Sequence, residues 1–147
     1  MKDIKTAEAF ANSWNNLPGG SVYTFDQFED WFAPLQKSDL KGKEVLELGC
    51  GNASLLVHAT QWEPSNLVGI DLGESIVSAN QNMSQTGFKN YRIEKADLTE
   101  YRAAEKFDVV YSIGVLHHLK NPVEGFTSAV ENTKPGGAFH CWVYAKE

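Results

Sequence analysis

The sequence predicts an α/β protein in which helices cover both faces of a mainly parallel β-sheet, giving a three-layer α/β/α sandwich. Two observations lead to this prediction. Short apolar runs recur along residues 45–144, and polar or turn-forming segments separate them, as in successive β-α-β units. The first run is followed at once by glycines and then by a helical pattern. This order is typical of α/β domains that bind a ligand beside the first strand.

Length and composition suit one domain with a substantial core, because 42% of the 147 residues are hydrophobic. The net charge is −6 and there is no basic run, which argues against nucleic acid held through its phosphates. No apolar run approaches the roughly 20 residues of a membrane span, and the first ten residues lack the apolar core of a signal peptide. We therefore expect a cytoplasmic protein without a membrane span or a nucleic-acid partner.

The two cysteines, Cys50 and Cys141, lie far apart in the sequence and show no metal-binding spacing. They are expected to be reduced thiols, as in most cytoplasmic proteins. No metal site is predicted.

Residues 1–40 are predicted to form a helical, aromatic-rich cap, and residues 41–147 the main domain. A first helix is expected over Lys5–Asn15, because its apolar residues recur at helical spacing. Glycine and proline in residues 17–21 then break the chain.

A second helix is expected within Tyr23–Leu35, and Pro34 should end it. This segment is crowded with aromatic residues, and two interpretations remain open. It can pack its apolar face on the sheet, or it can form a lid in which Trp14 or Tyr23 touches a ligand.

The main domain begins with an apolar strand, Val45–Leu48, followed by the turn Gly49-Cys50-Gly51. Parallel strands buried on both faces are continuously apolar, and glycines let the backbone bend sharply and approach a ligand. A helical segment, Ser54–Thr60, and a second strand, Leu67–Ile70, come next, and that strand ends on Asp71. A helix N-terminus beside the turn offers unpaired N–H groups.

About 22 residues separate Gly49 from Asp71, near the roughly 20 that place an acid against the ribose of a bound nucleotide. A dinucleotide site would have a third glycine where this chain has Ser54. Glu47 would also repel a pyrophosphate, whereas it suits a cofactor with an amino group and a sulfonium. The residues thus favour S-adenosylmethionine over NAD or FAD.

The later elements alternate in the same way. Asp108 starts a strand, away from the carboxyl ends where ligands bind, and is expected to be structural. The predicted segments are a helix over Glu74–Thr86 capped by Gly87, a strand over Tyr91–Lys95, a loop or short helix over Glu100–Glu105, a strand over Phe107–Ser112, a helix from Asn121-Pro122 to Val130, a tight turn at Lys134–Gly137 and a strand over Ala138–Tyr144.

The segment Glu47–Ala53 resembles the first motif of the class I S-adenosylmethionine-dependent methyltransferases, with Ala53 in the third glycine position. The start of the strand at Phe107 and the turn Lys134–Gly137 resemble later motifs of that family, in the same order. The resemblance covers Lys41–Tyr144. Through Leu116–Leu119 and the turn it extends to the broad set that includes ubiquinone- and menaquinone-biosynthesis enzymes.

This resemblance implies a Rossmann-like domain, the cofactor S-adenosyl-L-methionine with S-adenosyl-L-homocysteine as product, and a small-molecule acceptor. For Asp97, an N-cap of the following segment remains an alternative to a bond with adenine. The implied cofactor-binding residues are Glu47, Gly49, Cys50, Gly51, Asp71, Leu72, Ala96, Asp97, Leu98, Ser112 and Ile113.

His117 and His118 are the candidate catalytic residues, because imidazole titrates near neutral pH and can act as a general base on a hydroxyl or acidic carbon. The alternative is that one histidine packs inward and the other is solvated. Methyl transfer itself depends mainly on placing the acceptor in line, so the lack of an obvious catalytic dyad does not argue against an enzyme.

Five strands are visible of the seven usual in the family, which would leave the strand at Ala138–Tyr144 as a bare edge. A shortened form of a longer protein, a natural minimal form and a homodimer through this edge all explain the pattern, and we favour the first. The predicted function is methyl transfer to an unidentified small molecule. The alternatives are a non-catalytic cofactor-binding or partner module and an NAD-dependent oxidoreductase, and Glu47 argues against the second of these.

Overall fold

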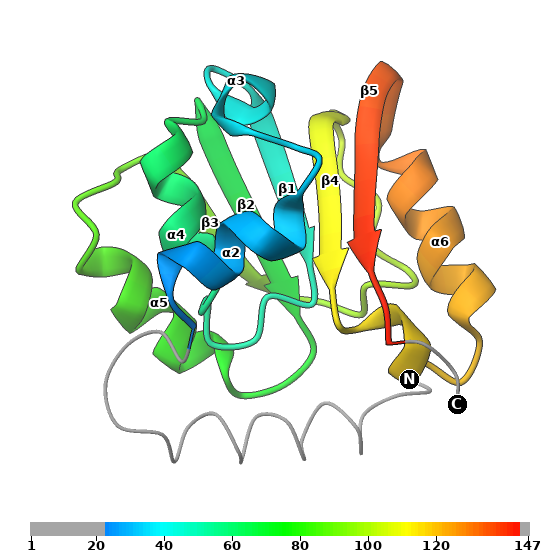
Figure 1. Ribbon diagram of the computed structural model, residues 1–147. Coiled ribbons are helices and arrows are strands. Elements are labelled where there is room, and N and C mark those ends of the chain that lie inside the picture. The colour runs from blue at the N-terminus through cyan, green and yellow to red at the C-terminus, as the bar shows by residue number, and fades with distance from the viewer. Residues whose placement is uncertain (1–22, 145–147) are drawn as a thin grey trace.

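The computed structural model describes residues 23–144. They form one sheet of five strands with helices on both faces (Figure 1). Every strand pair is parallel, and the strands lie in the order β3-β2-β1-β4-β5. This confirms the predicted three-layer α/β/α fold. The strands are β1 Glu44–Leu48, β2 Asn66–Asp71, β3 Tyr91–Lys95, β4 Phe107–Ile113 and β5 Thr133–Trp142.

Side chains that alternate along the strands build two cores, one on each face of the sheet. Val45, Leu67 and Tyr111 belong to one buried cluster, and their neighbours in sequence belong to the other. The helices on the first face are α2 Phe25–Phe32, α3 Lys37–Leu40, α4 Leu56–Ala59, the 3-10 turn η1 Thr60–Trp62 and α5 Ile76–Ser84. The second face is covered by the 3-10 turn η2 Leu116–His118 and α6 Pro122–Glu131.

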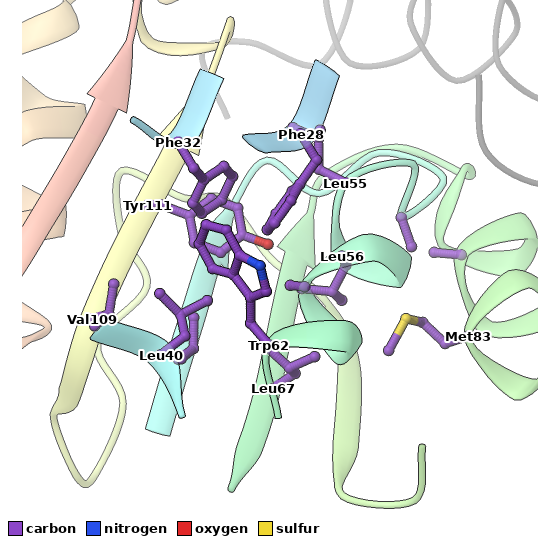
Figure 2. Close-up of a cluster of buried hydrophobic side chains, with 14 residues drawn as sticks. Phe28, Phe32, Leu40, Leu55, Leu56, Trp62, Leu67, Met83, Val109 and Tyr111 are labelled. Atoms are coloured by element: carbon purple, nitrogen blue, oxygen red, sulfur yellow. The ribbon is translucent and has the colours of Figure 1, made fainter. Parts of the chain in front are cut away.

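Helix α2 is anchored by aromatic side chains that enter the first core (Figure 2). Phe28 lies edge-on to Trp62, with ring centroids 4.7 Å apart, and Phe32 lies edge-on to Tyr111 at 4.6 Å. Burial of each phenylalanine contributes about 1.5–3 kcal/mol. Phe28 and Phe32 therefore follow the first interpretation of this segment, in which its apolar face packs on the sheet.

The bounds of α2 follow from local chemistry. Thr24 accepts a hydrogen bond from the backbone N–H of Gln27, whose side chain bonds back to the N–H of Thr24, so the helix starts with a capping box. The helix ends at Phe32, before Pro34, as predicted. The predicted helix Lys5–Asn15, residues 17–21 and Trp14 lie outside the described residues.

Several predicted elements needed correction, among them the helix predicted over Ser54–Thr60, which is α4 Leu56–Ala59 followed by the 3-10 turn η1. The tight turn at Lys134–Gly137 lies inside β5, because the pairing with β4 shifts between Phe107, opposite Thr133, and Val109, opposite Ala138. The extra residues bulge out of the ladder, and Gly136 takes φ 81° there. The helix predicted over Glu74–Thr86 is shorter in the structure, where α5 starts at Ile76 and ends at Ser84.

Asp108 has the structural role predicted for it. Its carboxylate accepts the backbone N–H of Glu44 at 2.9 Å and receives the Lys134 ammonium at 3.3 Å. The bond from Glu44 is the main reason that the pKa of Asp108 lies below its usual value. These bonds join the amino-terminal ends of β1, β4 and β5.

Replacing Asp108 with alanine is expected to lower the free energy of unfolding by about 1 kcal/mol, because it leaves a strand-end N–H and a lysine without their acceptor. Denaturant unfolding measures this. Asp30→Ala on the exposed side of α2 is the matched control and should change stability by less than about 0.5 kcal/mol. Equal effects of the two substitutions would contradict the structural role of Asp108.

The strand order reverses at β1, because β2 and β3 lie on one side of it and β4 and β5 on the other. In open parallel sheets, ligands bind outside the carboxyl ends of the strands at such a switch point. Within residues 23–144, no helix combines the length and the apolar character needed to cross a bilayer. The same residues contain no group of His, Cys, Asp or Glu side chains that could hold a metal ion.

Candidate functional site

A pocket opens at the switch point, outside the carboxyl ends of β1, β2 and β4. Its wall includes most of the predicted site residues, although they come from four separate segments of the chain. The predicted residues in the wall are Glu47, Gly49, Cys50, Asp71, Leu72, Asp97, Leu98, Ile113 and His118.

The glycine turn after β1 is bound to the end of β2. The backbone N–H groups of Gly49 and Cys50 both donate to the carbonyl of Ile70 at 2.9 Å. Gly49 has φ 81°, and a Cβ atom there would meet the methyl groups of Val115 at 2.9 Å. Both the turn conformation and the approach of Val115 therefore require glycine at this position.

Gly49→Ala is expected to destabilise the fold by about 2–4 kcal/mol, because it adds left-handed strain to a steric clash. Gly42→Ala is the matched control, since Gly42 has φ 72° but nothing within 4 Å of the added carbon. Gly42→Ala should lower the free energy of unfolding only by the left-handed strain, about 1–2 kcal/mol. Thermal unfolding of both variants measures the difference, and equal losses would show that the Val115 contact does not matter.

Asp71 joins the two loops that line the pocket. One carboxylate oxygen accepts the N–H of Gly51 at 3.0 Å, and the other accepts the N–H of Gly73 at 2.9 Å. Burial raises the pKa of Asp71, and these backbone bonds oppose that rise. The Leu72 N–H adds to these bonds, and the carboxylate lines the pocket, where it can face the hydroxyls of a ligand.

Glu47 is a buried acid that has no basic partner in the described part of the chain. Its side chain is 3% exposed, and one oxygen accepts the hydroxyl hydrogen of Tyr111 at 3.0 Å. Within residues 23–144, no ion pair includes it. Burial raises the pKa of Glu47 to about 8, and the charge of Asp71 adds to that rise. A cationic ligand group would stabilise the carboxylate.

Asp97 and Leu98 follow β3 on the next side of the pocket. One oxygen of Asp97 accepts both the N–H and the hydroxyl of Thr99, at 2.9 and 2.7 Å. Asp97 thus stabilises the turn after β3, but it is not the helix N-cap of the alternative interpretation, because no helix lies between β3 and β4. The other oxygen remains available for a ligand, so the bonds to Thr99 and a bond to adenine are compatible.

Four predicted site residues lie away from the pocket wall. The Ser112 hydroxyl is fully buried and donates to the carbonyl of Leu48 at 2.9 Å, so it joins β4 to β1. Ala96 packs in the core of the second face, and Gly51 contributes its N–H to Asp71. His117 also lies outside the wall.

The two candidate catalytic histidines differ in environment. His118 is exposed and lines the pocket. The ring nitrogens of His117 are shielded from solvent without a partner among the described residues. Desolvation lowers the pKa of His117, and the nearby His118 adds to that effect. The two rings lie 4.0 Å apart.

The sequence analysis missed several residues of the wall. Trp31 from α2 and Trp142 from β5 line the pocket together with Tyr144, although they are far apart in the sequence. Asn52 and Val115 also belong to it. The density of aromatic residues in the N-terminal segment was a signal for Trp31, although it could not show which rings face the site, and no pattern pointed to Trp142 or Tyr144.

The fold and the site together define an α/β domain with a nucleotide-cofactor pocket at the switch point. A family model described as a methyltransferase domain matches residues 39–144. The chain belongs to this methyltransferase-domain family.

Two curated relatives show how the family varies. A ubiquinone biosynthesis O-methyltransferase of Dechloromonas aromatica is 37% identical over 74% of this chain and 46% of its own length. A tRNA U34 carboxymethyltransferase of Desulfotalea psychrophila is 30% identical over 67% of this chain and 32% of its own length. The chain spans between 25% and 59% of the curated relatives compared.

A solved structure confirms the fold. The N-methyltransferase NodS from Bradyrhizobium japonicum, in complex with S-adenosyl-L-homocysteine, has a TM-score of 0.73 and 18% identity, over 95% of this chain and 71% of its own. Proteins of this fold thus include S-adenosylmethionine-dependent methyltransferases that were crystallised with S-adenosyl-L-homocysteine. Glu47, which has no basic partner among the described residues, the carboxylate of Asp71 and the glycine turn fit the amino, ribose and methionine parts of S-adenosylmethionine.

Proposed function

We propose that this protein binds S-adenosylmethionine at the switch-point pocket and transfers its methyl group to a small-molecule acceptor. The observation that carries the proposal is the pair of acids on one wall. Glu47 is buried without a basic partner among residues 23–144, and Asp71 accepts the backbone N–H groups of Gly51 and Gly73. An ammonium group satisfies the first acid and a ribose the second.

Each part of the wall then has a role. Glu47 and the turn at Gly49 hold the methionine end, while Cys50 and Ile113 line it. Asp71 accepts the ribose hydroxyls beside Leu72. Asp97 accepts the adenine amino group, and Leu98, only 9% exposed, packs against the ring. Gly51, Ala96 and Ser112 position these residues through the backbone and core contacts described above.

When bound, S-adenosylmethionine supplies a methyl group activated by a positive sulfonium, and the S–CH3 bonding pair stays with sulfur as the acceptor bonds to carbon. The chain contributes mainly by placing the acceptor and excluding water. His118, which lines the pocket, is positioned to take the proton that a hydroxyl acceptor loses. His117 packs against His118 and keeps its ring in place.

We also propose a cytoplasmic protein that acts on a small molecule and not on nucleic acid. Both cysteines are free thiols, which suits a reducing compartment. The net charge of −6 disfavours phosphate backbones. The outer edge of β5 has no partner strand among the described residues, and pairing of two copies through this edge is the homodimer we propose.

Transfer of a labelled methyl group tests the proposal. The protein is incubated with S-adenosylmethionine carrying a radioactive methyl group and with a panel of small hydroxyl, amine and carbon acceptors. Label in a small-molecule product, lost in the Asp71→Ala variant, would support the proposal. Tight cofactor binding with no transfer to any acceptor would instead support a non-catalytic binding module.

A further inference from the structure

One side of the pocket is a continuous aromatic wall formed by Tyr23, Trp31, Trp142 and Tyr144. Neighbouring rings touch along its length. The ring centroids are 4.8 Å apart between Tyr23 and Trp31, 5.5 Å between Trp31 and Trp142, and 5.0 Å between Trp142 and Tyr144. The acids Glu47, Asp71 and Asp97 belong to the same pocket, so it has an acidic half and an aromatic half.

Long-range hydrogen bonds fix this wall to the domain. His58 donates from Nε2 to the carbonyl of Tyr23 at 2.7 Å, and His140 donates from Nε2 to the carbonyl of Trp31 at 2.8 Å. The N–H of Gly114 donates to the carbonyl of Trp142 at 2.7 Å. These bonds hold the backbone that carries three of the rings, so that backbone needs little rearrangement when a ligand binds, which favours affinity.

The charge of the pocket restricts what can lie on the wall. No lysine or arginine lines the pocket among the described residues, and its only acids are those assigned to the cofactor. A carboxylate or phosphate on the acceptor would be desolvated without a counter-charge, which costs several kcal/mol. The wall therefore selects against anionic acceptors.

The geometry of the rings favours a flat acceptor over a cationic one. A cage for a cation turns several ring faces toward one open point. Here consecutive rings fill the space between each other, either edge to face, as for Trp142 and Tyr144 at 83°, or tilted, as for Trp31 and Trp142 at 33°. Tyr23 is nearly perpendicular to Trp31, at 85°, so Trp31 and Trp142 are the two rings of the wall that come nearest to one plane, on which a planar ring stacks.

We propose that the acceptor is an uncharged, planar aromatic or conjugated ring that stacks on the aromatic wall, with Trp31 and Trp142 as its main contacts. This inference rests on the proposed function, because the acidic half of the pocket must hold the cofactor. We assign to His118 the side of the acceptor ring that carries the acceptor atom, because His118 lines the same pocket and its ring centroid is 6.2 Å from that of Tyr144.

Calorimetric titration of the full chain, saturated with S-adenosyl-L-homocysteine, tests the acceptor class with defined probes. Naphthol is compared with decahydronaphthol, which has similar size and polarity but no flat ring, with naphthoate and with tetramethylammonium. Naphthol is expected to bind about tenfold more tightly than decahydronaphthol, since two ring contacts of ordinary strength give this factor. Naphthoate and tetramethylammonium should bind more weakly than naphthol.

Variants locate the binding on the wall. Trp31→Leu and Trp142→Leu should each weaken naphthol binding about threefold to tenfold, and Trp142→Phe, which keeps a ring, should restore most of it. Phe126→Leu on α6 is the matched control, because Phe126 is 39% exposed and does not line the pocket. It should leave naphthol binding unchanged.

Equal binding of naphthol and decahydronaphthol, tighter binding of either ion, or insensitivity to both tryptophan changes would overturn the proposal. Affinity for S-adenosyl-L-homocysteine, measured in the same samples, separates this failure from a failure of the proposed function. If the wild-type chain binds S-adenosyl-L-homocysteine but shows no preference for naphthol, only the acceptor class is wrong. If it does not bind S-adenosyl-L-homocysteine, the cofactor assignment fails.

Discussion

Replacing Glu47 with glutamine is expected to weaken binding of S-adenosyl-L-homocysteine more than 100-fold, because the ammonium group of the ligand loses its buried counter-charge, a loss of about 3–5 kcal/mol. The shape of the site should persist, since the glutamine carbonyl can still accept the Tyr111 hydroxyl hydrogen that Glu47 accepts at 3.0 Å. Calorimetric titration measures the loss. Glu44→Gln, on the same strand but at its other end, is the matched control and should bind normally.

The same substitution should stabilise the protein at alkaline pH. The pKa of Glu47 is about 8 in the folded protein against an ordinary value of 4.5. The folded state holds the proton more tightly, so the stabilising contribution of Glu47 is full below pH 4.5 and is lost as pH rises to about 8. Within that window the wild-type loses roughly 1.4 kcal/mol per pH unit through this group, whereas glutamine does not titrate.

Denaturant unfolding at a series of pH values checks this, and the Glu47→Gln curve should fall less steeply than that of the wild-type. Cofactor binding near neutral pH should also release a proton, because the ligand ammonium favours the charged carboxylate. Titrations in buffers of different ionisation enthalpy detect that proton. Normal binding by Glu47→Gln, together with unchanged pH dependence, would refute the role of this acid.

Asp71→Ala is expected to weaken S-adenosyl-L-homocysteine binding by about 1.5–3 kcal/mol, the range for lost hydrogen bonds to a charged group. The substitution removes the acceptor of the ribose hydroxyls and also releases the N–H groups of Gly51 and Gly73, which hold the two loops. Thermal unfolding should show a smaller loss of stability alongside. Calorimetry of purified variants measures the affinity.

Two further substitutions test whether the loss of affinity comes from the missing carboxylate oxygens of Asp71. Asp71→Asn keeps one carbonyl oxygen as acceptor. Its affinity for S-adenosyl-L-homocysteine should therefore lie between those of the wild-type and Asp71→Ala. Asp108→Asn alters an acid at the opposite end of the sheet, where it bonds to Glu44 and Lys134, and should leave affinity unchanged. If Asp71→Ala binds as tightly as the wild-type, the ribose assignment is wrong.

The sheet could be predicted because buried parallel strands leave a local signal. Val45–Leu48 and Leu67–Ile70 are continuous apolar runs, and they lie inside the observed β1 and β2. The contact between Gly51 and Asp71 was also predictable, since it follows from the spacing of one β-α-β unit. These features depend on residues close in sequence.

Features that depend on distant contacts could not be predicted. Lys134–Gly137 has the composition of a turn, and only its pairing with β4 makes it a bulge within β5. The direction of the Ser112 hydroxyl, toward the carbonyl of Leu48, depends on which face of β4 meets β1. Trp31 and Trp142 come together because α2 packs across the sheet, which no local pattern records.

Calorimetric titration of the wild-type chain with S-adenosyl-L-homocysteine, with NAD as the competing nucleotide, tests the central claim most directly. The site described here predicts one binding event of micromolar affinity for S-adenosyl-L-homocysteine and much weaker binding of NAD, because Glu47 opposes a pyrophosphate. A chain shown to be folded by circular dichroism that binds neither, or that binds NAD as tightly, would contradict the account.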